Sequence, residues 1–231
     1  MKTKRLPLKE QKGKWEMVVR YLDRIRQVWV GKSVPDLTAV FDAAWYLETY
    51  PDIVDVDPLV HFKSIGWAEG RNPHPLFDTE WYLTTYPDIE VSGQNPLDHY
   101  LKAGWREGRQ PNPLFHTQWY LASNPAIREA DVEPLTHYIR SGAEEGRHPN
   151  PVFDPAHYAS ACPDFRGTAK SALAHYLTKG WKQGYSPHPL FDPEWYRKKA
   201  SIPKSTEPLS HFLSMPSPQS PHPLFDATWY L

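Results

Sequence analysis

The chain has 231 residues, of which 40% are hydrophobic and 14% aromatic, and its net charge is −1. This composition supplies enough apolar surface for a folded core and excludes wholesale disorder. The single cysteine, Cys162, excludes an internal disulfide framework and any zinc site built from several cysteines.

Residues 1–36 form a basic N-terminal arm. Residues 1–32 hold ten Lys/Arg against three Asp/Glu, a charge of +7, while the remaining 16 basic and 24 acidic residues give −8. Over residues 14–30, apolar side chains recur at helical spacing with arginines between them, which predicts an amphipathic helix. Such a helix suits an anionic membrane surface, and it also suits a cap on a repeat array; these two interpretations are compatible. The residues expected at a membrane are Trp15, Arg20, Arg24, Arg26 and Trp29.

Residues 37–231 are a tandem array of one unit with a period of 34 to 38 residues. Self-similarity at such a period predicts one supersecondary structure repeated along the chain. We therefore look for function in columns of equivalent residues. The units begin at Phe41, Phe77, Phe115, Phe153 and Phe191, and a partial sixth unit begins at Phe225.

Each unit reads as a pair of short helices. In the second unit, Asp78 is placed to cap a helix from Thr79 to Tyr86, and Asp88 reads as a turn residue in a variable loop. Asn95 and the proline after it then open a second helix, which Gly104 is expected to end as a C′ glycine. Helices this short need burial of their aromatic face. The predicted fold class is therefore all-α, with tandem helix-pair repeats, proline-rich elbows and an N-terminal amphipathic helix.

A histidine recurs once in each complete unit and invites a metal or general-base interpretation. Neighbouring helices pack about 8–10 Å apart, so equivalent histidines cannot share one zinc ion, and no second ligand column completes a site. We favour a structural role in which each imidazole donates to a backbone carbonyl, and we expect no metal or cofactor. The column consists of His61, His99, His137, His175 and His211.

Two further columns are candidates for ligand binding or for contacts between repeats. Arginines close the Glu-Gly-Arg segments, where each can pair with a carboxylate of the protein or bind a phosphate or acidic sugar. Tryptophans follow the helix-ending glycines and can pack in the core or stack on sugar rings. These residues are Arg71, Arg109, Arg147, Trp67, Trp105 and Trp181. The recurring aspartates are expected to be helix caps, and no catalytic motif is visible.

The unit FDxxWYLxxYPD…NPLxHYLxxGWxEGRxPNPLFD resembles repeats that flank glycosyltransferase domains in bacterial capsule, O-antigen and exopolysaccharide biosynthesis proteins. It is also similar to repeats of large secreted bacterial proteins with calcium-binding repeats. The resemblance covers residues 41–231 and carries no catalytic residue over, because catalysis in such proteins belongs to a separate domain.

The resemblance implies a non-catalytic scaffold or binding module of a glycosyltransferase, and we expect the chain to be the N-terminal part of a longer enzyme. The alternative is a free-standing surface or secreted module that binds protein or carbohydrate. Expected partners are an anionic membrane, a polysaccharide or a glycosyltransferase domain, with no nucleic acid. No apolar segment of a secretory signal follows the basic start, so we expect a cytoplasmic protein, either free or peripheral on the inner face of the plasma membrane.

Overall fold

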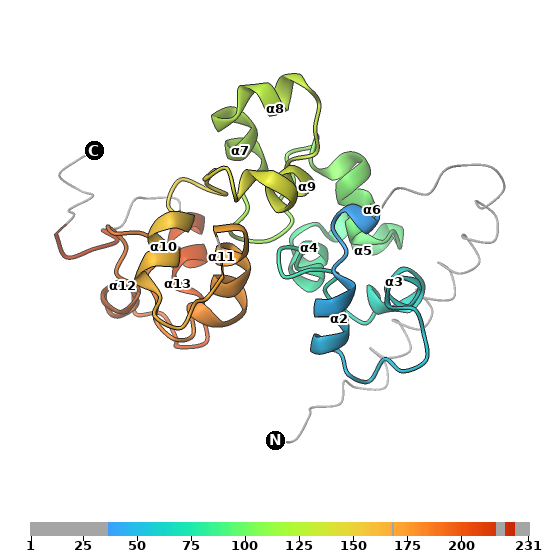
Figure 1. Cartoon of the computed structure of the whole chain (residues 1–231), viewed down its shortest axis with the longest axis horizontal. Coiled ribbons are helices and arrows are strands. Elements are labelled where there is room, and N and C mark those ends of the chain that lie inside the picture. The colour runs from blue at the N-terminus through green and yellow to red at the C-terminus, as the bar shows by residue number, and fades with distance from the viewer. Residues whose placement is uncertain (1–36, 168, 216–219, 225–231) are drawn as a thin grey trace. The chain divides into compact units, whose positions relative to one another are not determined.

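The computed structural model describes residues 37–167, 169–215 and 220–224, and over these residues the fold is all-α (Figure 1). The predicted fold class is confirmed, since short helices recur in pairs and no strand occurs in the described ranges. The arm, with the five residues expected at a membrane, and the partial unit from Phe225 lie outside them. The chain divides into two compact units, Met1–Asn112 and Pro113–Leu231, and each is described by itself.

The described part of the first unit, residues 37–112, contains a 3₁₀ turn, five α-helices and two π-helical turns. These are η1 (Leu37–Ala39), α2 (Ala43–Thr49), α3 (Pro58–His61), η2 (Phe62–Gly66), α4 (Thr79–Thr85), α5 (Pro87–Ser92), α6 (Pro96–His99) and η3 (Tyr100–Gly104).

The described part of the second unit is built from the same short α-helices and π-helical turns, except that no π-helical turn follows its last helix α13. It contains α7 (Thr117–Ser123), α8 (Pro125–Glu129), α9 (Pro134–His137), η4 (Tyr138–Gly142), α10 (Pro155–Ala161), α11 (Ala169–His175), η5 (Tyr176–Gly180), α12 (Pro193–Lys199) and α13 (Pro208–Ser214).

The first helix of each repeat starts at the residue type that the sequence indicates. The Asp78 carboxylate accepts a hydrogen bond from the Trp81 N–H at 3.0 Å, which satisfies one of the N–H groups left open at a helix start. Asp42, Asp154 and Asp192 cap α2, α10 and α12 in the same way. His116 occupies this place in the third repeat and makes no side-chain capping bond.

The segment after the first helix differs from the expected loop in two repeats. Pro87 and Pro125 are the first residues of the short helices α5 and α8, so Asp88 is a helical residue and its assignment to a turn was wrong. Proline fits the first helical position because the backbone N–H that it lacks would have no partner there. The prolines therefore end one helix and start the next.

Gly104 does not end the second helix as a C′ glycine, contrary to the sequence prediction. It is the last residue of the π-helical turn η3, and Trp105 after it keeps right-handed helical geometry. The left-handed residue that ends this segment is Gly108, with φ of 80°. Gly104 has a different reason to be glycine: a β-carbon there would lie 2.5 Å from the Tyr82 hydroxyl oxygen.

The core of each repeat is a cluster of three aromatic rings. In the second repeat, Phe77 lies 5.4 Å from Tyr82 and 5.9 Å from Tyr100 between ring centroids, and Tyr82 meets Tyr100 edge to face. All three side chains are fully buried. Edge-to-face pairs add to the hydrophobic free energy of burial. Equivalent clusters form around Tyr46, Tyr120, Tyr158 and Tyr196.

A backbone hydrogen bond closes each repeat on itself. The N–H of Asp78 donates to the carbonyl of Pro111 at 3.0 Å, which joins the start of the repeat to its end. The same bond, also at 3.0 Å, recurs in all five complete repeats. Its other donor–acceptor pairs are Asp42–Pro73, His116–Pro149, Asp154–Pro187 and Asp192–Pro221.

Neighbouring repeats are joined by buried polar side chains that the sequence analysis did not single out. The amide of Asn112 donates to the carbonyl of Leu76 at 2.7 Å, and Asn150 makes the equivalent bond to Leu114 at 2.8 Å. Between the fourth and fifth repeats, the Tyr176 hydroxyl donates to Glu207 at 2.6 Å. Because buried polar groups need hydrogen-bond partners, these bonds fix how one repeat lies against its neighbour.

Candidate functional site

The histidine column lies against the aromatic core, and its partner is a tyrosine hydroxyl in place of the backbone carbonyl that we expected. His99 is the last residue of α6, and its Nδ1 lies 2.9 Å from the hydroxyl oxygen of Tyr82 on α4. The pairing recurs in all five complete repeats at 2.7 to 3.1 Å. The other pairs are Tyr46–His61, Tyr120–His137, Tyr158–His175 and Tyr196–His211.

In the second repeat, the surroundings of His99 assign the proton of this bond to the tyrosine. The second ring nitrogen of His99, Nε2, lies 3.7 Å from the Glu107 carboxylate, and a carboxylate there favours the tautomer with hydrogen on Nε2. Nδ1 is then an acceptor, and the Tyr82 hydroxyl donates to it. His61 stands in the same relation to Glu69 at 4.0 Å.

Burial favours the neutral form of both Tyr82 and His99. Loss of solvent raises the pKa of Tyr82 far above its ordinary value and lowers the pKa of His99, to which Arg109 also contributes. Burial likewise raises the pKa of Tyr196, to about 12. A phenol with a raised pKa is a poor nucleophile and a poor base at neutral pH, so the pair is suited to hold two helices together.

No group of three or more His, Cys, Asp or Glu side chains with the spacing to hold a metal occurs among the described residues. In each pair, Nδ1 already faces a tyrosine hydroxyl.

The arginine column makes its contacts inside its own repeat. The Arg71 guanidinium donates through its two terminal nitrogens to Asp52 at 2.9 and 2.6 Å and through Nε to Glu69 at 2.6 Å. It also stacks over the Tyr50 ring, with 5.1 Å to the centroid. This arrangement uses one N–H of each guanidinium nitrogen on two carboxylates, which already neutralise the charge that an external anion would need.

Arg109 repeats this arrangement with Asp88 at 2.9 and 2.7 Å, Glu107 at 2.6 Å and the ring of Tyr86. The bonds from Arg109 lower the pKa of Asp88 below its ordinary value. The sequence allows each arginine a carboxylate of the protein as partner, but it did not identify Asp88, which was assigned to a turn. The recurrence of aspartate after the helix-ending proline was the signal for this second carboxylate.

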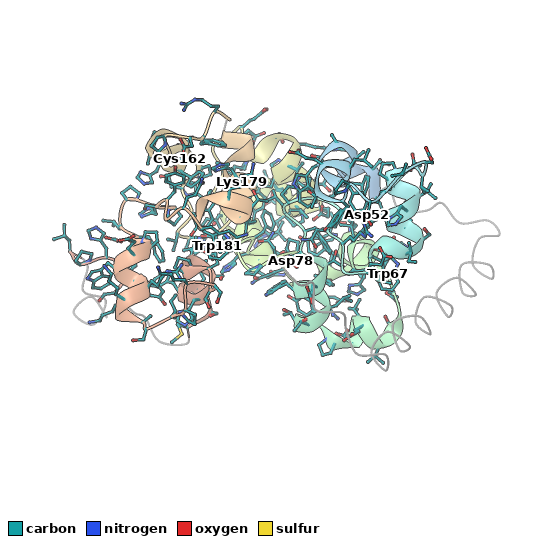
Figure 2. The ribbon with its side chains drawn as sticks, turned by 90° about the horizontal axis from the view of Figure 1, so that it is seen from below. Asp52, Trp67, Asp78, Cys162, Lys179 and Trp181 are labelled. Carbon is teal, nitrogen blue, oxygen red and sulfur yellow. The ribbon has the colours of Figure 1, made fainter. Side chains whose placement is uncertain are left out.

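The tryptophan column is divided by burial. Trp67 is fully buried and Trp105 is 4% exposed, so neither ring offers a face to a sugar. Trp181 in the fourth repeat is partly exposed, its indole N–H donates to the Leu177 carbonyl at 3.1 Å, and Lys182 lies over its ring (Figure 2 labels Trp67, Trp181 and Asp52). Of the three candidates for stacking, only Trp181 keeps accessible ring surface.

Comparison of the chain with protein-family models, with curated proteins and with solved structures finds no match. Within the described ranges, no helix combines the length and apolar content needed to cross a bilayer. The structural evidence on function therefore comes from the geometry of the repeats.

Proposed function

We propose that the chain is a non-catalytic helical-repeat scaffold that positions an enzyme or the acceptor of that enzyme. The proposal is supported by the observation that the recurring polar side chains bond to other groups of the same chain. The tyrosine hydroxyls hydrogen-bond to histidines, and the aspartates cap helices or pair with arginines. The Asn112 amide donates to a backbone carbonyl of the preceding repeat. A catalytic group needs an unoccupied reactive atom near a substrate position, and these columns direct their atoms at one another.

The enzyme that we propose for this scaffold is a bacterial glycosyltransferase of capsule, O-antigen or exopolysaccharide synthesis. The support is the resemblance of the repeat unit to repeats that flank such domains. The test is the genomic sequence downstream of codon 231. An open frame encoding a nucleotide-sugar-binding α/β domain supports the proposal, whereas a stop codon followed by an unrelated gene contradicts it. The purified chain is expected not to turn over nucleotide sugars.

A free-standing binding module is the second candidate. Apolar side chains on the surface of the first repeat favour it, because Val54, Val56 and Val60 are 66%, 49% and 57% exposed within seven residues of chain. Exposed apolar groups that lie close together are typical of contact surfaces. Fractionation of the source cells distinguishes the candidates: chain recovered from the medium or the outer surface favours the binding module, and chain in the cytoplasm favours the scaffold.

The basic arm suggests a peripheral membrane location for the scaffold. Basic residues near an anionic surface contribute on the order of 1 kcal/mol each and are screened by salt, while apolar burial adds a part that salt does not weaken. The chain is expected to sediment with anionic but not neutral liposomes, more weakly as salt rises. Deletion of residues 1–34 should abolish this binding and leave the repeats folded. Unfolding of the first repeat after this deletion, with no lipid binding by the intact chain, would identify the arm as a cap.

A further inference from the structure

The start of helix α3 is more exposed than the equivalent part of the later repeats. Each second helix has a leucine two positions before the recurring histidine. Leu59 is partly exposed, whereas the equivalent leucines of the second, fourth and fifth repeats are fully buried; these are Leu97, Leu173 and Leu209. The N-cap Asp57 is exposed as well, whereas the N-cap Asn95 of the second repeat is 3% exposed. The first repeat therefore leaves open a surface that later repeats bury.

In the fourth and fifth repeats, the π-helical turn of the preceding repeat lies against this position. The turn η4 contacts α11 of the next repeat. At the start of η5, the Tyr176 hydroxyl donates to Glu207, the N-cap of α13, at 2.6 Å. Tyr176 lies 15 positions before Phe191, the first residue of that next repeat. A segment of this length therefore reaches from the first phenylalanine of a repeat to the start of its second helix.

The chain before the first repeat has the length and the local packing to take that place. Val40 directly precedes the first phenylalanine of its repeat, as Leu76 does, and the two side chains are buried, with 2% and 1% exposure. The residue before Phe41 is thus buried as the last residue of a preceding repeat is. Counting 15 positions back from Phe41 reaches Arg26, which belongs to the helix predicted over residues 14–30. The arm therefore stands in the sequence where a preceding repeat carries its π-helical turn.

The exposed surface at the start of α3 is largely apolar. Val56 and Val60 lie on either side of the Asp57 cap and are 49% and 57% exposed. We call Val56, Asp57, Leu59 and Val60 the α3 surface. The later repeats have a polar or smaller residue in place of Val60; these are Asp98, Thr136, Ala174 and Ser210. The apolar character of this position is therefore specific to the first repeat.

The arm and the start of the first repeat carry opposite charges. Residues 42–60 hold five Asp or Glu and no Lys or Arg, whereas residues 1–32 carry a charge of +7. Of these acids, Asp55 and Asp57 are exposed beside the valines. The helix predicted over residues 14–30 adds an apolar face to this positive charge. The two segments are thus complementary in charge and in apolar surface, as the two sides of a specific contact are.

We propose that the N-terminal arm docks on the α3 surface and covers it as a preceding π-helical turn covers the fourth and fifth repeats. The apolar side chains of the predicted helix contact Val56, Leu59 and Val60. The ends of repeat arrays need such a cover, because no neighbouring repeat buries their apolar surface. The arm is favoured over a separate molecule, because its attachment at Leu37 gives it a high effective concentration. This docking describes the chain in solution, and an anionic membrane competes for the same apolar side chains.

The test is the loss of NMR signal near a nitroxide on the arm of the full chain. The label is attached at Gln27→Cys, a polar position of the predicted helix, and the buried Cys162 is replaced by alanine, which occurs at the equivalent position of the fifth repeat. We expect the amide signals of the α3 surface to lose intensity and that of Leu209 to keep it, because η5 already contacts the start of α13. Reduction of the nitroxide should restore the lost signals.

Two valine variants separate the docking from general effects. Val60→Ser removes apolar surface from the contact and copies Ser210 of the fifth repeat. We expect the ratio of docked to free arm to fall by about tenfold, and the signals of Asp57 and Leu59 to recover in part. Val91→Ser is the matched control, because Val91 lies on α5 of the second repeat and is 88% exposed; this change should leave the signal loss unaltered.

Three results would contradict the docking. No signal loss at the α3 surface would overturn it and leave that surface to an external partner, as a free-standing binding module requires. Equal loss in the Val60→Ser variant, with unchanged circular dichroism, would overturn the contact with the α3 surface. The same loss in a mixture of spin-labelled chain and separate isotope-labelled chain would show the arm of a second copy, and would overturn docking within one chain.

Discussion

The second repeat, residues 77–114, and the third, residues 115–152, share their aromatic core and differ around it. We call the surface positions of Tyr86, Asp88 and Arg109 in the second repeat, and their equivalents in the third, the rim. Both bury a phenylalanine and two tyrosines, and both pair a tyrosine with a histidine, Tyr82 with His99 and Tyr120 with His137. Around this core, the rim residues Tyr86 and Asp88 are replaced in the third repeat, and so are the buried Trp105 and the capping Asp78.

The difference teaches which contacts the repeat requires. The tyrosine hydroxyl lies in the protein interior, where a missing partner costs about 1–3 kcal/mol, so its histidine and its glycine cannot change independently. The ion pair between Arg109 and Asp88 lies at the surface, where such pairs add little, so that position is open to replacement. The residues that both repeats keep are therefore those that contact the buried tyrosine hydroxyl, whereas burial alone does not preserve a residue, since Ala143 replaces the buried Trp105.

The glycine inside the π-helical turn offers the largest test of the shared core. Gly104→Ala places a methyl group 2.5 Å from the Tyr82 hydroxyl oxygen, and we expect a loss of about 3 kcal/mol in unfolding free energy. Gly142→Ala should cost at least as much, since the Tyr120 hydroxyl lies closer still to the added methyl group. Urea unfolding measures both losses. Adding Tyr82→Phe to Gly104→Ala should recover part of the loss, and strictly additive losses would show that the hydroxyl is not what the methyl group meets.

The histidines should matter equally in both repeats although the rims differ. His99→Ala is expected to lower the unfolding free energy by about 1–3 kcal/mol, because it leaves the Tyr82 hydroxyl buried without its partner. His137→Ala should match it within error. Neither change should alter the metal content of the protein. Stoichiometric zinc in purified protein that disappears in the His99 variant would replace the structural role with a metal site.

As the pH is lowered, we expect the buried histidines to reduce the stability of the protein at a higher pH than the surface carboxylates do. Burial lowers the pKa of His99, His137 and His175 and that of His74 to about 4, so between pH 6.5 and 4 these four histidines bind more protons in the unfolded chain than in the folded one. Stability then falls as pH drops, by on the order of 1–2 kcal/mol after discounting the partial exposure of these rings. The rim carboxylates with lowered pKa add their loss only at lower pH. Thermal midpoints measured from pH 7 to pH 4 check this order, and a flat profile would contradict it.

The rim pair of the second repeat should give the smallest effect. Asp88→Ala makes this position the same as Ala126 of the third repeat and leaves Arg109 paired with Glu107. We expect a decrease in thermal midpoint smaller than that of any core variant, and one that disappears as salt is raised. A decrease as large as that of Gly104→Ala would mean that the rim also carries the fold.

Much of the fold could be predicted from the sequence because its signals are local. Asp78 before a helical pattern and Asn95 before a proline specify helix starts through their own backbone neighbours, and both are confirmed as caps. The role of Gly104 could not be predicted in this way. The reason for that glycine is a hydroxyl 22 residues earlier in the chain, and only packing brings the two together.

The candidate columns were recognisable from the sequence, but their partners were not. Spacing places His99 and Arg109 at fixed points of the repeat, yet a partner such as Tyr82 or Asp88 lies 17 or 21 residues away on another helix. Burial decides the tryptophans in the same way, since Trp67 and Trp181 share a sequence position and differ in exposure. The alanine at position 126 acquires meaning only once the second repeat shows what the carboxylate of Asp88 does at the equivalent position.

The hydrogen bond that closes each repeat, from Asp78 to Pro111 in the second, has a consequence for how the chain folds. The two residues that it joins are never more than 33 positions apart in the sequence. The ends of each repeat therefore come together when one short segment of chain forms a loop. The entropy of closing a segment grows only slowly with its length, and short separations between contacts accompany fast folding. A chain of such repeats can therefore lengthen by whole units without a slower search for the native contacts of any one of them.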